Sequence, residues 1–140
     1  MTGLTGTISK VTVTLSNMSH TFPTDIDILL VGPGGQNVLL MSDAGADLDI
    51  NNVTLTFDDD ASEFLPENAQ IVSGTFKPTN YGSGDTFTAP APNPPYGSLL
   101  NVFNGTNPNG TWNLFVTDPF SPDSGIIADG WSLTITTTCP

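Results

Sequence analysis

A strand that ends in a glycine- and proline-rich turn constrains the fold of this chain more than any other feature. The segment Thr24–Gly35 reads TDIDILLVGPGG, and its apolar residues recur at every second position, as in a strand with one buried face. Those residues are Ile26, Ile28 and Leu30. Proline then removes an N–H donor and glycine allows the positive φ of a turn, so the strand stops at GPGG. Gln36–Ser42, QNVLLMS, is a second apolar run of strand length, and the two segments predict a β-hairpin.

Other segments alternate in the same way and predict further strands. They are Thr7–Ser16, Val53–Asp58, Thr111–Asp118 and Gly130–Thr138, with shorter strands at Ile71–Pro78 and Leu99–Phe103. Ala61–Gln70 has room for one helical turn at most, because it is short and contains Pro66. The 14 glycines and 12 prolines supply many turn signals. We therefore expect an all-β fold, a jelly-roll-like β-sandwich of about eight short antiparallel strands, in a single domain over residues 1–140.

Three longer connections join the expected strands. Asn17–Thr24 carries the only histidine, and Pro119–Asp129 is expected to form an acidic turn. Thr79–Gly97 is too long and too rich in proline for a hairpin turn, so we expect it to cross over an end of the fold. We interpret it as a loop that covers core edges, with an aromatic binding loop as the alternative. Trp112 and Trp131 stand at inward positions of the closing strands, which we take to be neighbours, and are expected in the core.

The charge of the chain excludes several classes of partner. Only Lys10 and Lys77 oppose 14 acidic side chains, which gives a net charge of −12. Binding to nucleic acid through phosphates requires lysine and arginine, as does docking on anionic lipid, so neither is expected. No apolar run is long enough to insert into a membrane. Most carboxylates cannot find a basic partner, so either a divalent cation or a solvated acidic surface must accommodate the charge.

Candidate catalytic residues are few. His20 is the only imidazole, no G-x-S-x-G motif accompanies it, and we expect it to hydrogen-bond the turn before the central strand. One histidine and the single Cys139 cannot complete a zinc site. Two carboxylates can support glycoside hydrolysis, but among 14 acids some pair meets the required separation by chance. Catalysis by this chain is therefore not expected.

Calcium is the metal that these residues are suited to bind. It takes about six to eight oxygen ligands from carboxylates, amides and backbone carbonyls. The acidic residues gather near predicted strand ends and in one loop that contains glycine and alanine, without the spacing of an EF-hand. The candidate ligands are Asp25, Asp27, Asp43, Asp47, Asp49, Asp58, Asp59, Asp118, Asp123 and Asp129. We expect at least one structural Ca2+, and the alternative is a solvated acidic rim.

Several motifs follow one another in a recognisable order. The first half of the chain holds His20-Thr21, then Asp25-Ile26-Asp27-Ile28-Leu29-Leu30 and Gly32-Pro33-Gly34-Gly35. The second half holds Gly110-Thr111-Trp112-Asn113-Leu114-Phe115-Val116-Thr117-Asp118, Asp123-Ser124-Gly125 and Trp131-Ser132-Leu133. This pattern resembles the P domain, or P/homo-B domain, of kexin- and furin-type proprotein convertases and of many bacterial secreted proteins. The Thr79–Gly97 insertion and the loose match at Phe103-Asn104-Gly105 point to the bacterial branch.

The resemblance implies a jelly-roll β-sandwich beside a catalytic or adhesive domain, where it supports folding, calcium dependence and substrate handling and is not itself the protease. We predict a non-catalytic, calcium-stabilised accessory module of a secreted or cell-surface protein. Its expected partners are neighbouring domains of a longer parent chain, with a protein or glycan ligand left open. The first ten residues, MTGLTGTISK, lack the features of a signal peptide.

Two other functions remain open from the sequence. A carbohydrate-binding module on a similar sandwich is the leading alternative, and it would need exposed aromatic side chains. The residues placed for that are Tyr81, Tyr96 and Phe120. An isolated enzyme domain is the third possibility.

Overall fold

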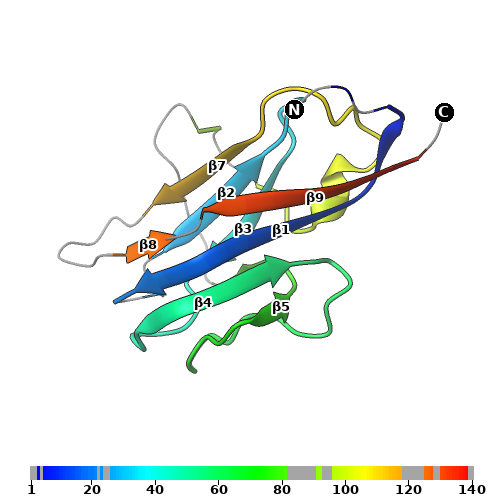
Figure 1. Ribbon diagram of the computed structural model, residues 1–140. Coiled ribbons are helices and arrows are strands. Elements are labelled where there is room, and N and C mark those ends of the chain that lie inside the picture. The colour runs from blue at the N-terminus through cyan, green and yellow to red at the C-terminus, as the bar shows by residue number, and fades with distance from the viewer. Residues whose placement is uncertain are drawn as a thin grey trace.

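The fold consists of two β-sheets that pack over a shared core (Figure 1). The computed structural model describes residues 3, 5–21, 23, 26–81, 91–92, 96–117, 125–127 and 130–138. One sheet has the order β5-β4-β1-β8, with β9 also paired to β1, and the other has the order β6-β3-β2-β7. The elements are β1 Thr7–His20, β2 Asp27–Val31, β3 Asn37–Ser42, β4 Ile50–Phe57, β5 Gly74–Phe76, β6 Thr79–Asn80, the 3-10 helix η2 Leu100–Phe103, β7 Asn113–Thr117, β8 Gly125–Ile127 and β9 Trp131–Thr138.

The structure confirms the all-β sandwich. β8 pairs with the end of β1 and β9 pairs with its beginning, along the same edge, so these two act as one interrupted strand. Most strand pairs are antiparallel, but the short β5 and β6 pair in parallel with β4 and β3. The chain therefore departs from the expectation of a purely antiparallel fold only at two short strands at sheet edges. Among the residues described, no helix is long and apolar enough to cross a membrane.

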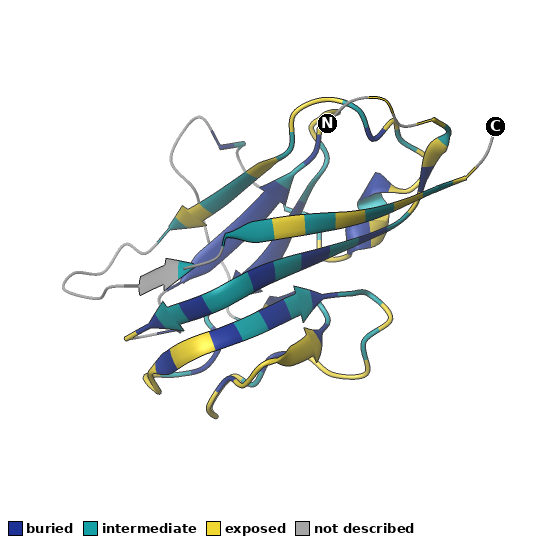
Figure 2. Cartoon of the chain, in the orientation of Figure 1, coloured by how far each residue is buried: buried dark blue, intermediate teal, exposed yellow. Residues whose placement is uncertain are grey.

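The predicted central hairpin is present as β2 and β3, and it forms the middle of the core. Gly35 takes a φ of 90° in the turn between the strands, a conformation that glycine adopts without steric cost. Figure 2 shows β2 and β3 buried along nearly their whole length, whereas β1 and β4 alternate between buried and more exposed residues. β9 alternates between intermediate and exposed residues. Ile28 and Leu30 face the main core, and Leu29 lies on the other face of the sheet.

A second, smaller cluster explains why Leu29 is buried although it faces away from the main core. Leu29 and Leu39 pack with Ala91, and Tyr96 and Phe115 lie against them. Ala91 and Tyr96 belong to the proline-rich Thr79–Gly97 segment. Within its described residues this segment therefore covers a sheet face, which agrees with the covering loop expected from the sequence. Its first residues form β6.

β1 is longer than predicted because a bulge carries it past Ser16. Asn17 has a φ of 54°, and the register with β4 shifts on both sides of Met18. An inserted residue changes which side chains face inward, so Met18 and His20 are buried after Leu15. The prediction that His20 lies in a connecting loop was therefore wrong. β4 also begins earlier than predicted, at Ile50, which pairs with His20.

Other element predictions were wrong for local reasons. Leu99–Phe103 was expected as a strand, but Leu100–Phe103 forms η2, whose first N–H groups are held by the Asp59 carboxylate. Ala61–Gln70, expected to hold one helical turn at most, contains no helix. The expected strand at Ile71–Pro78 shortens to β5, and the expected turn at Pro119–Asp129 contains β8.

The two tryptophans are partly buried against the main core rather than fully inside it. They do not sit on neighbouring strands, as the sequence suggested: β7, which follows Trp112, pairs with β2, whereas Trp131 begins β9, which pairs with β1. Each tryptophan therefore lies near a sheet edge and keeps part of its surface exposed.

Candidate functional site

Where the structure describes them, the aspartates that the sequence singles out lie at two opposite ends of the sandwich. At one end β1 and β3 finish while β2 and β4 begin, because His20 pairs with Ile50 and Asp27 pairs with Ser42. We call this the distal end. At the opposite, proximal end, Thr7 pairs with Thr138 and β4 finishes at Phe57. Figure 1 shows the two chain termini toward the proximal end.

At the proximal end, the aspartates that follow β4 are held by basic and backbone donors. The Lys10 ammonium lies 3.0 Å from Oδ1 of Asp58 and also bonds the Asp60 carboxylate. These hydrogen bonds, first to Asp60 and then to Asp58, raise the pKa of Lys10. Burial of Asp58 opposes its ionisation, but the Asp60 N–H and Lys10 outweigh that effect and lower the pKa of Asp58 below its ordinary value.

Asp59 has a different structural role at the same end. Its two carboxylate oxygens accept hydrogen bonds from the backbone N–H groups of Leu100, at 2.8 Å, and Asn101, at 2.9 Å. These N–H groups open η2 and have no partner within the helix, so Asp59 acts as a cap from a distant part of the chain. The Lys77 ammonium donates to the Asp59 carbonyl oxygen at 2.9 Å. Both lysines of the chain therefore lie at the proximal end.

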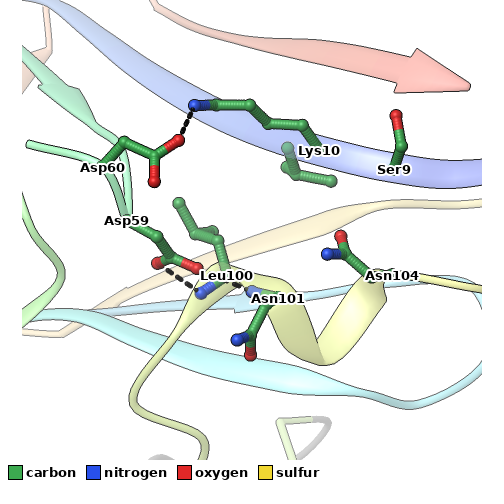
Figure 3. A pocket seen from close by; sticks show the side chains of 8 residues that line it. Ser9, Lys10, Asp59, Asp60, Leu100, Asn101 and Asn104 are labelled. Carbon is green, nitrogen blue, oxygen red and sulfur yellow. Dashed lines mark hydrogen bonds and ion pairs between the residues drawn. The ribbon is translucent and has the colours of Figure 1, made fainter.

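A polar groove of about 330 Å³ lies between these residues, β1 and η2 (Figure 3). Its lining residues are Ser9, Lys10, Val11, Asp59, Asp60, Leu100, Asn101 and Asn104. In the close view, the Lys10 side chain extends toward Asp60, and the Asp59 carboxylate points at the start of η2. The charged groups of this groove are thus engaged with one another or with backbone.

At the distal end, two carboxylates converge on one hydroxyl group. The Ser42 Oγ lies 2.9 Å from Oδ1 of Asp27 and 3.1 Å from Oδ2 of Asp43. Ser42 is fully buried and Asp27 is 8% exposed. A serine hydroxyl has one proton, so it donates to one of the two carboxylates at a time. We refer to Asp27, Ser42 and Asp43 as the distal cluster.

Of the other predicted metal ligands, the structure describes two. Asp47 and Asp49 are exposed in the loop between β3 and β4, where the Asp49 carbonyl accepts a hydrogen bond from Gln70. Asp25, Asp118, Asp123 and Asp129 lie outside the described residues. Within the described ranges, no three His, Cys, Asp or Glu side chains gather as a metal-binding group. Calcium binding and its ligands therefore stay a prediction.

The aromatic residues suggested as sugar platforms are held by backbone carbonyls where they are described. The Tyr81 hydroxyl donates to the Leu65 carbonyl, and the Tyr96 hydroxyl donates to the Pro92 carbonyl at 2.9 Å. Burial raises the pKa of the Tyr81 phenol, and the charge of Glu67 raises it further. Phe120 lies outside the described residues. Tyr81 and Tyr96 both pack against hydrophobic clusters.

The motifs that were recognised in the sequence lie next to one another in space. A Cβ on Gly32 would stand 2.8 Å from Phe103 and 3.2 Å from Trp112, and a Cβ on Gly110 would stand 2.7 Å from Pro33. Both glycines are therefore needed for the close packing of the GPGG turn against the GTW segment. His20, of the His-Thr pair, is likewise paired with Gly125. The spatial fit of these motifs explains their residue types.

Comparison with known families agrees with this arrangement. The family model of the proprotein convertase P-domain matches residues 8–135, nearly the whole chain. The chain belongs to the P-domain family. No curated protein and no solved structure matches it. P domains are non-catalytic accessory domains, and the family belongs to secreted proteins.

Some residues that shape this P domain were not identified from the sequence. Ser42 was missed because its partner across the hairpin depends on a register shift between Ile28 and Leu29. The contact of Asp59 with η2 joins residues 41 positions apart, and the sequence carries no local signal for it. The ion pairs of Lys10 with Asp58 and Asp60 were partly indicated by the sequence. Lys10 lies on a correctly predicted strand, and as one of only two lysines it was bound to attract carboxylates.

Proposed function

We propose that this P domain is an accessory module of a secreted or cell-surface protein, that it supports the folding or interactions of a neighbouring domain, and that Ca2+ stabilises it. The observation that carries the accessory role is the match of the P-domain family model along nearly the whole chain. An accessory module acts through its surface and its stability, so stabilisation of the fold by Ca2+ is the first part of the proposal to test.

The calcium part of the proposal rests on the distal cluster. Two carboxylates and a hydroxyl offer hard oxygen atoms around one point, which is the chemistry that Ca2+ prefers. These side chains supply fewer than the six to eight or so ligands of a typical site, so backbone carbonyls and water would complete the coordination. Asp58 and Asp59 already bond to Lys10 and to η2, which makes their carboxylates poorer candidates.

The positions of the two lysines also favour the distal end as the calcium site. Lys10 and Lys77 both lie at the proximal end, and the chain contains no other lysine or arginine. A net charge of −12 makes the folded state repel itself, most strongly where carboxylates gather far from these ammonium groups. A cation that binds only the folded chain at the distal end would relieve this repulsion and stabilise the fold.

Thermal unfolding of the purified domain tests the calcium proposal. Melting should be followed in chelator, in millimolar Ca2+, in millimolar Mg2+ and in NaCl of matched ionic strength. A ligand at a hundred times its Kd adds about 2.7 kcal/mol to the free energy of unfolding, so Ca2+ should raise the melting temperature clearly. Mg2+ should act less, because it demands a regular octahedral site.

A matched pair of variants locates the effect. Asp43→Asn should reduce the calcium response and leave the domain in chelator unchanged or slightly more stable, because it removes one of two converging charges. Asp60→Asn, at the proximal end, should keep the full calcium response. Equal melting temperatures in all four solutions, or an effect of NaCl equal to that of Ca2+, would contradict the proposal and favour a solvated acidic rim.

The accessory role is tested separately by assays for hydrolysis. The purified domain should cleave neither peptide, ester nor glycoside substrates. Reproducible cleavage that one point substitution abolishes would show that the chain is an enzyme in its own right.

A further inference from the structure

The sandwich has edge strands of two kinds. On one side the sheets end in β5, of three residues, and β6, of two residues. On the other side they end in β8 and β9, of three and eight residues, and in β7, of five residues. An edge strand displays a row of N–H and C=O groups that invites pairing, and proteins commonly protect it with short length, charge, proline or a bulge. The first side is protected by short length.

β9 is long, and the one register shift in its pair with β1 lies near its far end, between Ile8 and Lys10 of β1. Its sequence is WSLTITTT, without a charged residue, a proline or a glycine. Its exposed face carries hydroxyl side chains, namely Ser132, Thr134, Thr136 and Thr138. Among the described strands it pairs with β1 alone. β9 is therefore a long, uncharged edge.

The direction of the free backbone groups of β9 follows from its register. Ser16 N–H donates to the Gly130 carbonyl at 2.9 Å, and the next pairs along the strand are Leu15 with Trp131 and Thr14 with Ser132. In an antiparallel pair, residues alternate between bonding to the partner and pointing away from it. Ser132, Thr134 and Thr136 thus bond toward β1. The N–H and C=O groups that point away belong to Trp131, Leu133, Ile135 and Thr137.

The side chains of these outward-bonding residues also line an apolar strip. Trp131, Leu133 and Ile135 are only partly buried against the main core. Trp112, just before β7, and Leu114, within β7, are partly buried in the same way. Val116, also in β7, is 51% exposed. Figure 1 shows β7 and β9 on the same side of the sandwich, opposite β5. Backbone groups without a partner among the described strands therefore occur together with incompletely covered apolar side chains on this side.

We propose that the β7–β9 side of the domain accepts an extended segment of a partner protein, which adds to β9 as an antiparallel strand. Its backbone would bond the outward groups of β9, and its alternate apolar side chains would cover the strip, as in other cases of strand addition. The net charge of −12 repels a second copy of this chain and acidic segments. The segment that fits is therefore one with alternating apolar residues and neutral or basic residues between and beside them.

Synthetic peptides test the proposal, with KTVTITVTK as the main probe and ETVTITVTE as its acidic counterpart. Binding is measured by calorimetry, and the bound strand is located by amide hydrogen exchange in NMR spectra. In the free domain the amides of Leu133 and Ile135 should exchange faster than those of Ser132 and Thr134. KTVTITVTK should protect Leu133 and Ile135, and ETVTITVTE should bind at least about tenfold more weakly.

Selective N-methylation of the peptide distinguishes strand addition from contact by side chains alone. In an antiparallel pair, peptide residues whose side chains face the strip are also those that bond to Leu133 and Ile135. N-methylation of the valines and isoleucine should therefore weaken binding at least about tenfold, because several hydrogen bonds are lost. N-methylation of the threonines should leave binding nearly unchanged.

A pair of exposed valines provides a matched control in the protein. Val116→Lys puts a charge on the strip and should weaken peptide binding, whereas Val72→Lys, at a position 59% exposed before β5, should not. Absence of binding at millimolar peptide, equal effects of the two N-methylation patterns, or equal binding of the acidic probe would overturn the proposal. So would a concentration-dependent dimer in which Leu133 and Ile135 are protected without peptide, since the occupant would then be a second copy.

Discussion

Aspartates at the two ends of this sandwich meet different surroundings. At the proximal end, Asp58 and Asp60 pair with Lys10, and Asp59 receives two backbone N–H groups from η2. At the distal end, Asp27 and Asp43 both approach the hydroxyl of Ser42. The first group meets an ammonium group and backbone N–H groups, whereas the two carboxylates of the second group share a serine hydroxyl.

The difference teaches that an aspartate's role depends on the donors that the fold brings to it. The proximal aspartates tie β1, the turn after β4 and η2 together, so they stabilise the fold in any solution that keeps them ionised. The distal aspartates bring two carboxylates to one buried hydroxyl, and under the calcium proposal the stability that they confer depends on the cations in solution. The following predictions test this contrast, from the largest expected effect to the smallest.

Trp112→Ala should cost the most, about 2–4 kcal/mol in the free energy of unfolding, because a large ring that packs on Phe103 is removed. The centroids of the two rings are 4.9 Å apart, and the Trp112 Nε1–H also donates to the Pro108 carbonyl. Chemical denaturation should give the same loss in chelator and in Ca2+. Trp112→Phe is the control and should lose less. A nearly unchanged free energy of unfolding for Trp112→Ala would mean that the stability of the proximal end does not depend on the packing of this ring.

Asp59→Ala should lower the free energy of unfolding by about 1–2 kcal/mol, because the N–H groups of Leu100 and Asn101 lose their shared acceptor. The loss is measured by urea unfolding and should be equal with and without Ca2+. Asp60→Ala, whose carboxylate is largely exposed, should lose less. A loss for Asp59→Ala that appears only in Ca2+ would assign this residue to a metal site instead.

Ser42→Ala should cost about 1 kcal/mol in chelator, since the buried Asp27 carboxylate loses a donor. The cost should shrink in Ca2+, because the ion supplies positive charge where the hydroxyl proton was. Unfolding in urea at both conditions measures the difference, with the more exposed Ser16→Ala as a control. An equal cost in both solutions would remove the distinction between the two ends.

The ion pair of Lys10 and Asp58 should produce the smallest effect, visible as a dependence on pH. The lowered pKa of Asp58 stabilises the fold above its ordinary value of 3.8, and this is lost as pH falls through the folded value. The raised pKa of Lys10 stabilises the fold below its ordinary value of 10.5, and this is lost as pH rises through the folded value. The difference in melting temperature between the wild type and Lys10→Met should therefore be largest near neutral pH.

The same pH series carries its own control. In acid below the folded pKa of Asp58 the two proteins should converge, because the pair no longer exists. The difference should remain small throughout, since both side chains are partly exposed to solvent. A difference that grows toward acid pH would contradict the direction of the Asp58 shift.

The sequence by itself determined the fold class and the centre of the core. Alternation with a period of two over the segments that form β1, β4 and β9 leaves one apolar face per strand, and the apolar runs of β2 and β3 supply the second sheet that covers this face. The turn at Gly32–Gly35 was also readable, because few residues other than glycine adopt its positive φ. The motif order was sufficient to predict the P-domain family, which the family model confirms.

The tertiary structure alone decided which residues meet. The bulge at Asn17 moved His20 from an expected loop into β1, and the register shift in the central hairpin placed Ser42 opposite Asp27. A single inserted residue reverses which face of the sheet every later side chain in the strand points to. The alternation of apolar residues in the sequence does not predict where such an insertion occurs. The burial of Leu29 likewise depends on Ala91 and Tyr96, which come from far along the chain.

The aspartates show the same limit for function. Their number and lack of basic partners follow from composition, but all of them look alike in the sequence. Whether a carboxylate is used by a lysine, a helix start or a shared hydroxyl depends on contacts between residues that are 15 to 50 positions apart. Such contacts arise only when the sheets pack, because hydrogen bonds and ion pairs act over a few ångströms while the sequence pattern records only which side of a strand each residue faces.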